Sequence, residues 1–298
     1  MKILVFGRGV IGSQYGWALE NAGHTVDFYV RKEKRDIYAQ GINAIIHDGR
    51  IREYRKFHWD INLIDEIKTE HDYDLIFLSI NPEQVPAAID YLAPRIGNAT
   101  LLFFCNYGKD IYKAIGSIPA NQVVFGFPGA GGGYEGNNLY GILMKSVEIG
   151  YTGMASTGRE KEVIELFKSA GFKVSLQKNI YEWLFLHYIA NAAMEGAAAE
   201  AGGFKEAISS SKALAHMVIN IRKMSPYLKA KGVKKNGLIT VMSIFPPKLM
   251  GAIMKNLVYK PGSPMHMAQS HNHFKPGYAV EEIKADAKEL GIILDFNS

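Results

Sequence analysis

The sequence predicts an α/β fold, a doubly wound parallel sheet followed by an all-helical C-terminal domain. Residues 1–177 alternate short apolar runs, typical of strands, with amphipathic stretches that have the spacing of helices. Residues 74–80 and 100–105 are predominantly apolar, as strands covered on both faces of a sheet are. Residues 178–298 carry long helical patterns instead. We therefore predict two domains, residues 1–177 and residues 178–298.

The elements of the first domain follow from these patterns. Strands are predicted at residues 2–6, 26–30, 74–80, 100–105, 123–127, 143–151 and 172–176. Helices are predicted at residues 13–22, 82–92, 109–115 and 160–170. Residues 42–46 and 50–57 are expected to form two short strands at the edge of the same sheet. The run GAGGGYEG at residues 129–136 has five glycines and fits two interpretations, a flexible linker or a loop that lets backbone approach a ligand.

In the second domain, helices are predicted at residues 180–201, 211–231 and 280–290. Residues 241–259 are the most apolar part of this half, and Pro246 with Pro247 divides them into two helices joined by a corner. We expect this segment to lie in a core, with a contact to a membrane surface or another subunit as the alternative. The small-residue helix at 180–201 and this methionine-rich segment are compatible with a homodimer.

The composition, 48% hydrophobic and 21% charged, is that of an ordinary globular protein. A formal net charge of +5 suits anionic small molecules, but no basic block with interleaved aromatic residues predicts a nucleic-acid partner. Cys105 is the only cysteine, which excludes intrachain disulfides and favours a reducing compartment. It lies in an apolar run and is expected to be a buried structural thiol. The chain enters a strand at once and has no membrane-length apolar run, so a cytoplasmic protein with no membrane partner is expected.

The glycines at the start of the chain predict a nucleotide site. The first strand runs into Gly7-Arg8-Gly9-Val10-Ile11-Gly12, which opens a helix, and a second strand follows. In a Rossmann-type fold the first glycine permits a tight turn, the second lets backbone approach a pyrophosphate, and the third packs the helix on the strand. We therefore predict that residues 7–12 bind a dinucleotide. The alternative is a glycine turn that only packs a helix against a sheet.

The end of the second strand indicates which dinucleotide is bound. NAD sites usually have an acidic residue there, whereas this chain has Arg31, Lys32, Lys34 and Arg35. A guanidinium group pairs with a phosphate in a forked geometry. Arg31 therefore favours NADP(H) over NAD(H), and the other cations are expected to lie partly on a solvated face.

The chain resembles the ketopantoate reductase family, the 2-dehydropantoate 2-reductases. The resemblance lies in the opening residues 2–31, in Cys105-Asn106-Tyr107-Gly108 at a strand end, and in the segment from Ser263 to Gly291-Ile292. It implies an NADPH-dependent enzyme of two domains that binds cofactor and a 2-oxo acid in the cleft between them. Asn106 lies at the carboxyl end of a sheet strand, and we therefore predict that it holds the nicotinamide or the substrate.

The family's catalytic positions are only partly matched. Where the family has a lysine that donates a proton to the carbonyl, this chain has His187, with the matching Asn191 one turn later. The family's glutamate, twelve residues after its serine, falls on Lys275 when counted from Ser263. Asn81 occupies a position after an apolar strand where many members have lysine, and we predict that it contacts the cofactor.

These residues still allow the chemistry. Hydride transfer to a ketone creates an alkoxide that needs a proton, and an imidazolium can supply it, so His187 is predicted to be a general acid. The alternative for His187 is a structural histidine. Asn191 and Ser263 are predicted to bind polar groups of the substrate. Lys275 is predicted to pair with a substrate carboxylate or a cofactor phosphate, with a surface lysine as the alternative.

We therefore predict an NADP(H)-dependent oxidoreductase that reduces a small, ketopantoate-like 2-oxo acid. The alternative is a non-catalytic NADP(H)-binding redox sensor or partner subunit, because three catalytic positions depart from the family. His266, His271 and His273 lie close together in sequence, but they lack the spacing of a known metal motif, and we predict no metal site.

Overall fold

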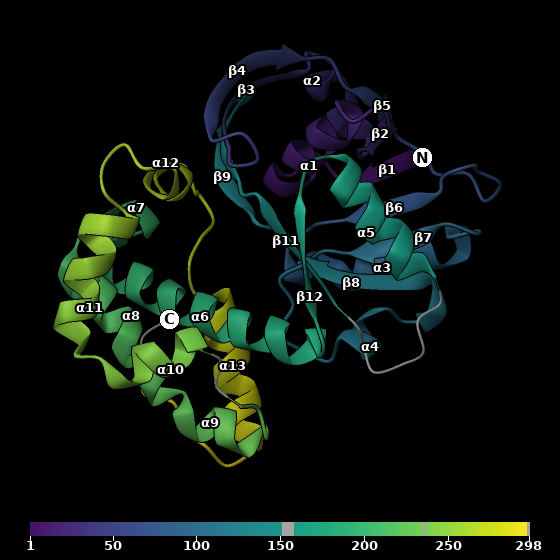
Figure 1. Ribbon diagram of the computed structural model, residues 1–298. Coiled ribbons are helices and arrows are strands. Elements are labelled where there is room, and N and C mark those ends of the chain that lie inside the picture. The colour runs from purple at the N-terminus through teal and green to yellow at the C-terminus, as the bar shows by residue number, and fades with distance from the viewer. Residues whose placement is uncertain (151–157, 235–236, 297–298) are drawn as a thin grey trace. The chain divides into compact units, whose positions relative to one another are not determined.

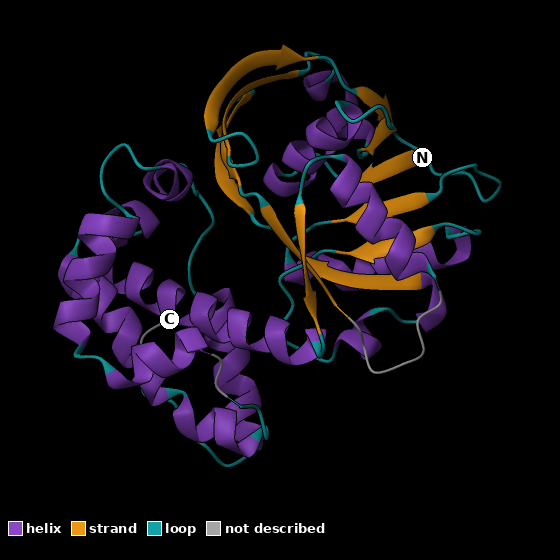
Figure 2. Ribbon diagram, in the orientation of Figure 1, coloured by secondary structure: helices purple, strands orange, loops and turns teal. Residues whose placement is uncertain are grey.

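A computed structural model describes residues 1–150, 158–234 and 237–296. The chain divides into two compact units, Met1–Tyr181 and Glu182–Ser298. Among the described residues, all strands lie in the first unit and the second contains only helices (Figure 2). The predicted fold class is therefore confirmed. The division between the units lies four residues beyond the end predicted for the first domain at residue 177.

The first unit is built on an eight-stranded sheet with the order β12-β11-β8-β7-β6-β1-β2-β5. All neighbouring strands in it are parallel except β8 and β11. The stretch β5-β2-β1-β6-β7-β8 has the strand order of the dinucleotide-binding doubly wound fold. Its strands are β1 (Lys2–Phe6), β2 (Thr25–Tyr29), β5 (Asn62–Ile64), β6 (Leu75–Leu78), β7 (Thr100–Phe103), β8 (Val123–Phe127), β11 (Ser146–Gly150) and β12 (Lys173–Gln177).

Helices cover both faces of this sheet (Figure 1). On one face lie α1 (Val10–Glu20) and α5 (Arg159–Ser169), and an aromatic cluster centred on Tyr15 joins them to the strands. On the other lie α3 (Val85–Leu92), preceded by a short 3₁₀ turn (Pro82–Gln84), and α4 (Ile111–Ala114). The predicted strand at 143–151 is β11, although residue 151 lies outside the described residues.

Two predictions about this unit are wrong. Residues 42–46 and 50–57 do not extend the edge of the main sheet, because β3 (Ile42–Asp48) and β4 (Glu53–Trp59) belong to a second sheet with the order β4-β3-β10-β9. Residues 129–136 are neither a linker nor a ligand loop, because β9 (Ala130–Glu135) pairs with β10 (Asn138–Leu143). The second sheet packs on α1, which is why α1 is buried on nearly all sides.

The remaining short helices of this unit lie in connections between the strands. A 3₁₀ turn (Lys32–Lys34) and α2 (Arg35–Tyr38) follow β2, and two further 3₁₀ turns lie at Ala93–Arg95 and Ala120–Gln122. None of these turns contains a buried residue.

The second unit is centred on α6 (Ile180–Ala201), and a large apolar cluster surrounds its small-residue part. The predicted helix at 211–231 is two helices that meet at Met224, just ahead of Pro226. The unit's other helices are α7 (Phe204–Ile208), α8 (Ser211–Lys223), α9 (Ser225–Ala230), α10 (Gly237–Ile244), α11 (Pro247–Ile253), a π-helical turn (Met254–Val258), α12 (Pro264–Ser270) and α13 (Tyr278–Glu289). Among the described residues, no helix is long and apolar enough to cross a membrane.

Candidate functional site

The predicted cofactor residues of the first unit gather at one edge of the main sheet. The glycine loop follows β1, Arg31 follows β2, Asn81 follows β6 and Asn106 follows β7. These four strands are adjacent and parallel, in the order β7-β6-β1-β2, so their carboxyl ends meet at the same edge. The strand order reverses between β1 and β6, and this switch point is where doubly wound sheets bind ligands.

The three glycines of the loop occupy their positions for different structural reasons. Gly7 has a φ of 94°, a left-handed conformation that favours glycine. A Cβ on Gly12 would lie 2.8 Å from Val5 Cγ1, so Gly12 allows α1 to pack on β1. Gly9, in contrast, has a φ of −78°, and its Cβ would meet nothing closer than Ser79 O at 3.7 Å. Neither the backbone conformation nor the packing therefore requires glycine at position 9. The open space beside Gly9 would let a ligand approach the backbone closely.

The start of α1 is suited to an anion. Gly9 is its N-cap, no side chain caps the helix, and its first turn contains no acidic residue. Val10 and Ile11 form its first turn, so their backbone N–H groups lack helical acceptors and point from the positive end of the helix. A phosphate at this position would satisfy these donors.

The side chain of Arg8 binds other parts of the protein, although its place in the glycine loop predicts a contact with the cofactor. Its guanidinium group donates to Gly41 O at 2.9 Å and to Asn137 Oδ1. It also lies over the rings of Tyr38 and Tyr134, at 4.6 and 4.7 Å from their centroids. The side chain thus ties the loop to the second sheet, while its buried Nε has no hydrogen-bond partner. If Arg8 contacts a cofactor, only its backbone and its Nε are therefore left for that contact.

The cations after β2 are of two kinds. Arg35 pairs with Asp65 at 3.3 Å, whereas Arg31 is exposed and takes part in none of the ion pairs found among the described residues. Arg31 is in an extended conformation as the N-cap of the following 3₁₀ turn. Its guanidinium group is thus available to a ligand at the end of β2.

Asn81 and Asn106 also differ. Asn81 is exposed and begins a 3₁₀ turn, where its backbone N–H donates to Gln84 Oε1 at 3.3 Å. Asn106 Oδ1 is buried and has no hydrogen-bond partner, which is costly unless a ligand supplies a donor. Cys105, beside it, is the buried structural thiol that the sequence predicts, and burial raises its pKa to about 12.

In the second unit, His187 and Asn191 lie one turn apart on the same side of α6. Both are half-buried, in contrast to Tyr188, Ile189 and Ala192, which are in the apolar core. Trp183 lies one turn earlier, and its ring stacks on His187 with the ring centroids 5.3 Å apart. Burial lowers the pKa of His187 to about 4, so the imidazole is neutral at pH 7.

Ser263 and Lys275 have contrasting surroundings. Ser263 is the N-cap of α12, accepts from His266 N–H at 3.1 Å and donates to Val258 O at 2.9 Å. Its hydroxyl proton is therefore used within the protein, and only an acceptor position is left for a substrate. Lys275 is exposed and takes part in no ion pair found among the described residues.

The histidines near α12 do not converge on a metal position. His271 Nδ1 lies 2.8 Å from Met267 O, and His266 Nδ1 lies 3.4 Å from Ser270 Oγ. Within the part of the chain that the structure describes, no group of three or more His, Cys, Asp or Glu side chains could hold a metal ion.

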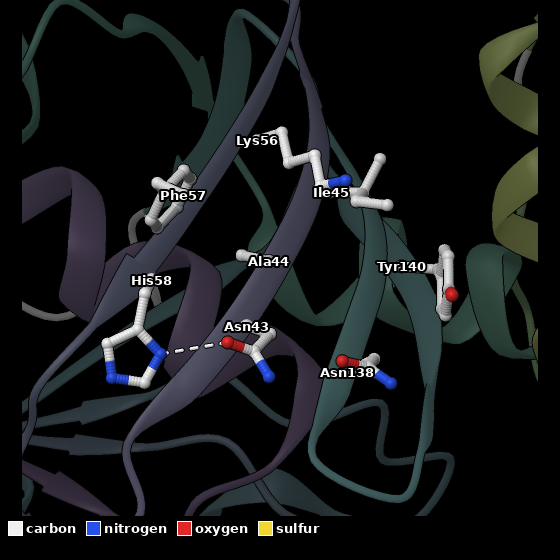
Figure 3. A pocket seen from close by; sticks show the side chains of 8 residues that line it. All are labelled: Asn43, Ala44, Ile45, Lys56, Phe57, His58, Asn138 and Tyr140. Carbon is white, nitrogen blue, oxygen red and sulfur yellow. Dashed lines mark hydrogen bonds between the residues drawn. The ribbon is translucent and has the colours of Figure 1, made fainter.

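A surface pocket of about 590 Å³ lies on the outer face of the second sheet (Figure 3). His58, Asn43 and Asn138 form one row across β4, β3 and β10, and His58 Nδ1 lies 2.8 Å from Asn43 Oδ1. Lys56, Ile45 and Tyr140 form the next row. The sequence does not single out these residues as a site. Asn43 and Ile45 alternate with the buried Ile42, Ala44 and Ile46, as residues on the outer face of a strand do.

This chain is similar to known proteins in sequence and in fold. Residues 3–144 match the family described as "Ketopantoate reductase PanE/ApbA". The resemblance to the ketopantoate reductase family is thereby confirmed for residues 3–144, which are just under half of the chain. The 2-dehydropantoate 2-reductase of Nostoc sp. is 22% identical over 186 residues, which cover 60% of this chain and 57% of that protein. The enzyme of the same name from Vibrio cholerae is 28% identical over 115 residues, or 39% of this chain and 34% of that protein.

Solved structures of ketopantoate reductases and a dehydrogenase share the fold. A D-mandelate dehydrogenase with NADH and anilino(oxo)acetate is 17% identical with a TM-score of 0.73, over 99% of this chain and 94% of that one. A 2-dehydropantoate 2-reductase from Geobacter metallireducens is 15% identical with a TM-score of 0.70, over 99% and 95% of the two chains. At these identities the likeness concerns the fold.

Proposed function

We propose that this protein is an NADP(H)-dependent oxidoreductase that reduces the ketone of a small 2-oxo acid. The observation that carries the proposal is the glycine loop: Gly9 leaves space that the protein does not need, beside a helix N-terminus without a cap. The family supports a reductase, and the mandelate dehydrogenase structure with NADH supports a nicotinamide cofactor for this fold.

The residues at the sheet edge fit a dinucleotide. The N–H groups that follow Gly9 would hold the pyrophosphate, and Asn106 Oδ1 would accept a hydrogen bond from the nicotinamide amide. Arg31 would pair with the 2′-phosphate that distinguishes NADP from NAD. When bound, this cofactor supplies the hydride.

The chain itself supplies the proton and the orientation of the substrate. We propose that His187 donates a proton to the oxygen of the ketone, and that Asn191, on the same side of α6, donates its amide N–H to a substrate oxygen. Ser263 would accept a hydrogen bond from the substrate, and Lys275 would pair with its carboxylate. In this proposal, His187 replaces a lysine that is charged at neutral pH.

The test is NADPH oxidation by the purified protein with ketopantoate and a panel of related 2-oxo acids, with nucleotide binding measured in the same samples. Turnover of one acid supports the proposal and identifies the substrate. Nucleotide binding without turnover of any acid contradicts it. That result would favour a non-catalytic NADP(H) sensor, for which the neutral His187 and the exchange of the family's glutamate for Lys275 are the supporting observations.

A further inference from the structure

The helices α10 and α11 and the π-helical turn expose an apolar surface in the second unit. Phe245, Leu249, Ile253 and Leu257 recur every four residues and are all exposed, Leu257 at 73%. We call these four residues the apolar stripe. Ile244, at the end of α10, is 71% exposed beside it. Several exposed apolar side chains within one short segment indicate a candidate interaction site in a folded protein.

The stripe cannot turn inward, because the opposite side of α11 is already fixed. Gly251 is buried against α8, and a Cβ at this position would lie 2.2 Å from Ser211 O and 2.8 Å from Ala215 N. Met254 is buried in the apolar core of the unit. Rotation of α11 would force these contacts apart, so the exposed stripe is a permanent feature of the folded unit.

The chain segment that contains the stripe has charged side chains of one sign only. Between Glu206 and Glu281 the chain has 74 residues with eleven Lys or Arg and no Asp or Glu. The helices α8, α10 and α11 all lie within this acid-free segment, and α10 and α11 both pack on α8. Lys248 and Lys260 are exposed and Lys255 is half-buried, and none of the three takes part in an ion pair found among the described residues.

We propose that the apolar stripe and its lysines bind the surface of an anionic lipid bilayer. Exposed apolar side chains on a helix flanked by lysines match an interface that is apolar below and negatively charged above. A second copy of this chain fits less well, because two stripes face to face would bring together Lys248 and Lys255 of both copies without a carboxylate from α8, α10 or α11. This proposal does not depend on the proposed enzymatic function.

The test is co-sedimentation of the full-length protein with phosphatidylcholine vesicles, with and without phosphatidylglycerol. Binding is expected only to vesicles that contain phosphatidylglycerol, and it should weaken as salt concentration rises. Lys248→Gln and Lys255→Gln are each expected to weaken binding about fivefold. Leu249→Ser with Leu257→Ser is expected to weaken it at least tenfold, because less apolar surface is inserted.

Two matched control variants distinguish binding through this surface from non-specific binding to vesicles. Ile293→Ser removes a large apolar side chain that is 92% exposed outside the stripe, and Lys288→Gln removes an exposed lysine of α13. Neither is expected to change vesicle binding. Sedimentation velocity without vesicles tests the second copy as the occupant. A dimer that the stripe substitutions dissociate would overturn the proposal, as would absence of vesicle binding or equal effects of the control substitutions.

Discussion

Gly12 lies so close to Val5 that a Cβ on Gly12 would stand 2.8 Å from Val5 Cγ1. The contact joins the first turn of α1 to the middle of β1, and it thereby fixes the position of the helix N-terminus at the sheet edge. Gly9, three residues earlier in the same loop, has no such neighbour. The two glycines therefore allow structure and ligand binding to be tested separately.

Gly12→Ala is expected to lower the free energy of unfolding of the first unit by about 1–3 kcal/mol, because the added methyl group overpacks the contact with Val5. Gly9→Ala is expected to leave thermal stability unchanged and to weaken NADPH binding at least tenfold, because its methyl group would occupy the space proposed for the pyrophosphate. Thermal unfolding and NADPH titration of both variants provide the measurements. Full NADPH affinity in a stable Gly9→Ala protein would argue against a nucleotide at this loop.

Arg31→Ala is expected to weaken NADPH binding about tenfold or more while NADH binding changes little, because only NADPH carries the 2′-phosphate. Titration of both nucleotides against the variant is the measurement. Arg35→Ala serves as the matched control, since Arg35 is already paired with Asp65. If Arg31→Ala weakens both nucleotides equally, Arg31 does not select between them, and the cofactor assignment changes to NAD(P) without preference.

His187 gives a pH dependence whose direction follows from its pKa. Burial lowers this pKa to about 4, so the protonated fraction falls about tenfold for each pH unit above that value. If His187 is the general acid, kcat/KM for reduction of the 2-oxo acid rises as pH falls from 8 toward 5. The measurement is a pH profile of kcat/KM with the acid that the substrate panel identifies.

His187→Gln is the matched variant for this profile, because glutamine is polar but does not titrate. We expect much slower turnover, a flat profile and unchanged NADPH binding. The same slope in the variant and the wild type would remove His187 as the proton donor.

The lowered pKa of His187 also affects stability, because folding favours the neutral imidazole. The contribution of His187 to the free energy of unfolding is complete above about pH 6.5 and is lost as pH falls toward 4.

The nucleotide loop was predictable because its signal is local. Strand, glycine turn and helix lie within residues 2–20, and each glycine acts through near neighbours in sequence. The second sheet was not predictable from local patterns, because β3 pairs with β10, about a hundred residues later in the chain. The glycines of residues 129–136 fit a linker or a ligand loop in the sequence, but in the structure they allow close packing, since a Cβ on Gly132 would lie 2.0 Å from Tyr140 O. On the neighbouring β10, a Cβ on Gly141 would lie 2.6 Å from Gln14 Oε1 of α1.

The side chains proposed for catalysis have no local signal. His187 and Lys275 were selected only through the resemblance to a family whose residues differ at both positions. Ser263 shows how a side chain chosen in this way can have another use, because its hydroxyl caps α12 and donates to Val258 O. The environment of His187, stacked on Trp183 with a lowered pKa, depends on packing that sequence patterns do not reveal.

Glu195 provides a stability test within the second unit. It is buried on α6, and its Oε2 accepts hydrogen bonds from the backbone N–H groups of Gly277 and Ala279, both at 2.9 Å. These donors lie at the start of α13, so the carboxylate satisfies N–H groups that have no acceptor within that helix.

Glu195→Ala is therefore expected to lower the free energy of unfolding by about 2–4 kcal/mol. Glu195→Gln keeps an acceptor and should cost less, while Glu289→Ala, at the exposed end of α13, should stay within about 0.5 kcal/mol of the wild type. Chemical denaturation of the three variants measures these differences, and equal stabilities for Glu195→Ala and Glu289→Ala would show that this carboxylate does not anchor α13.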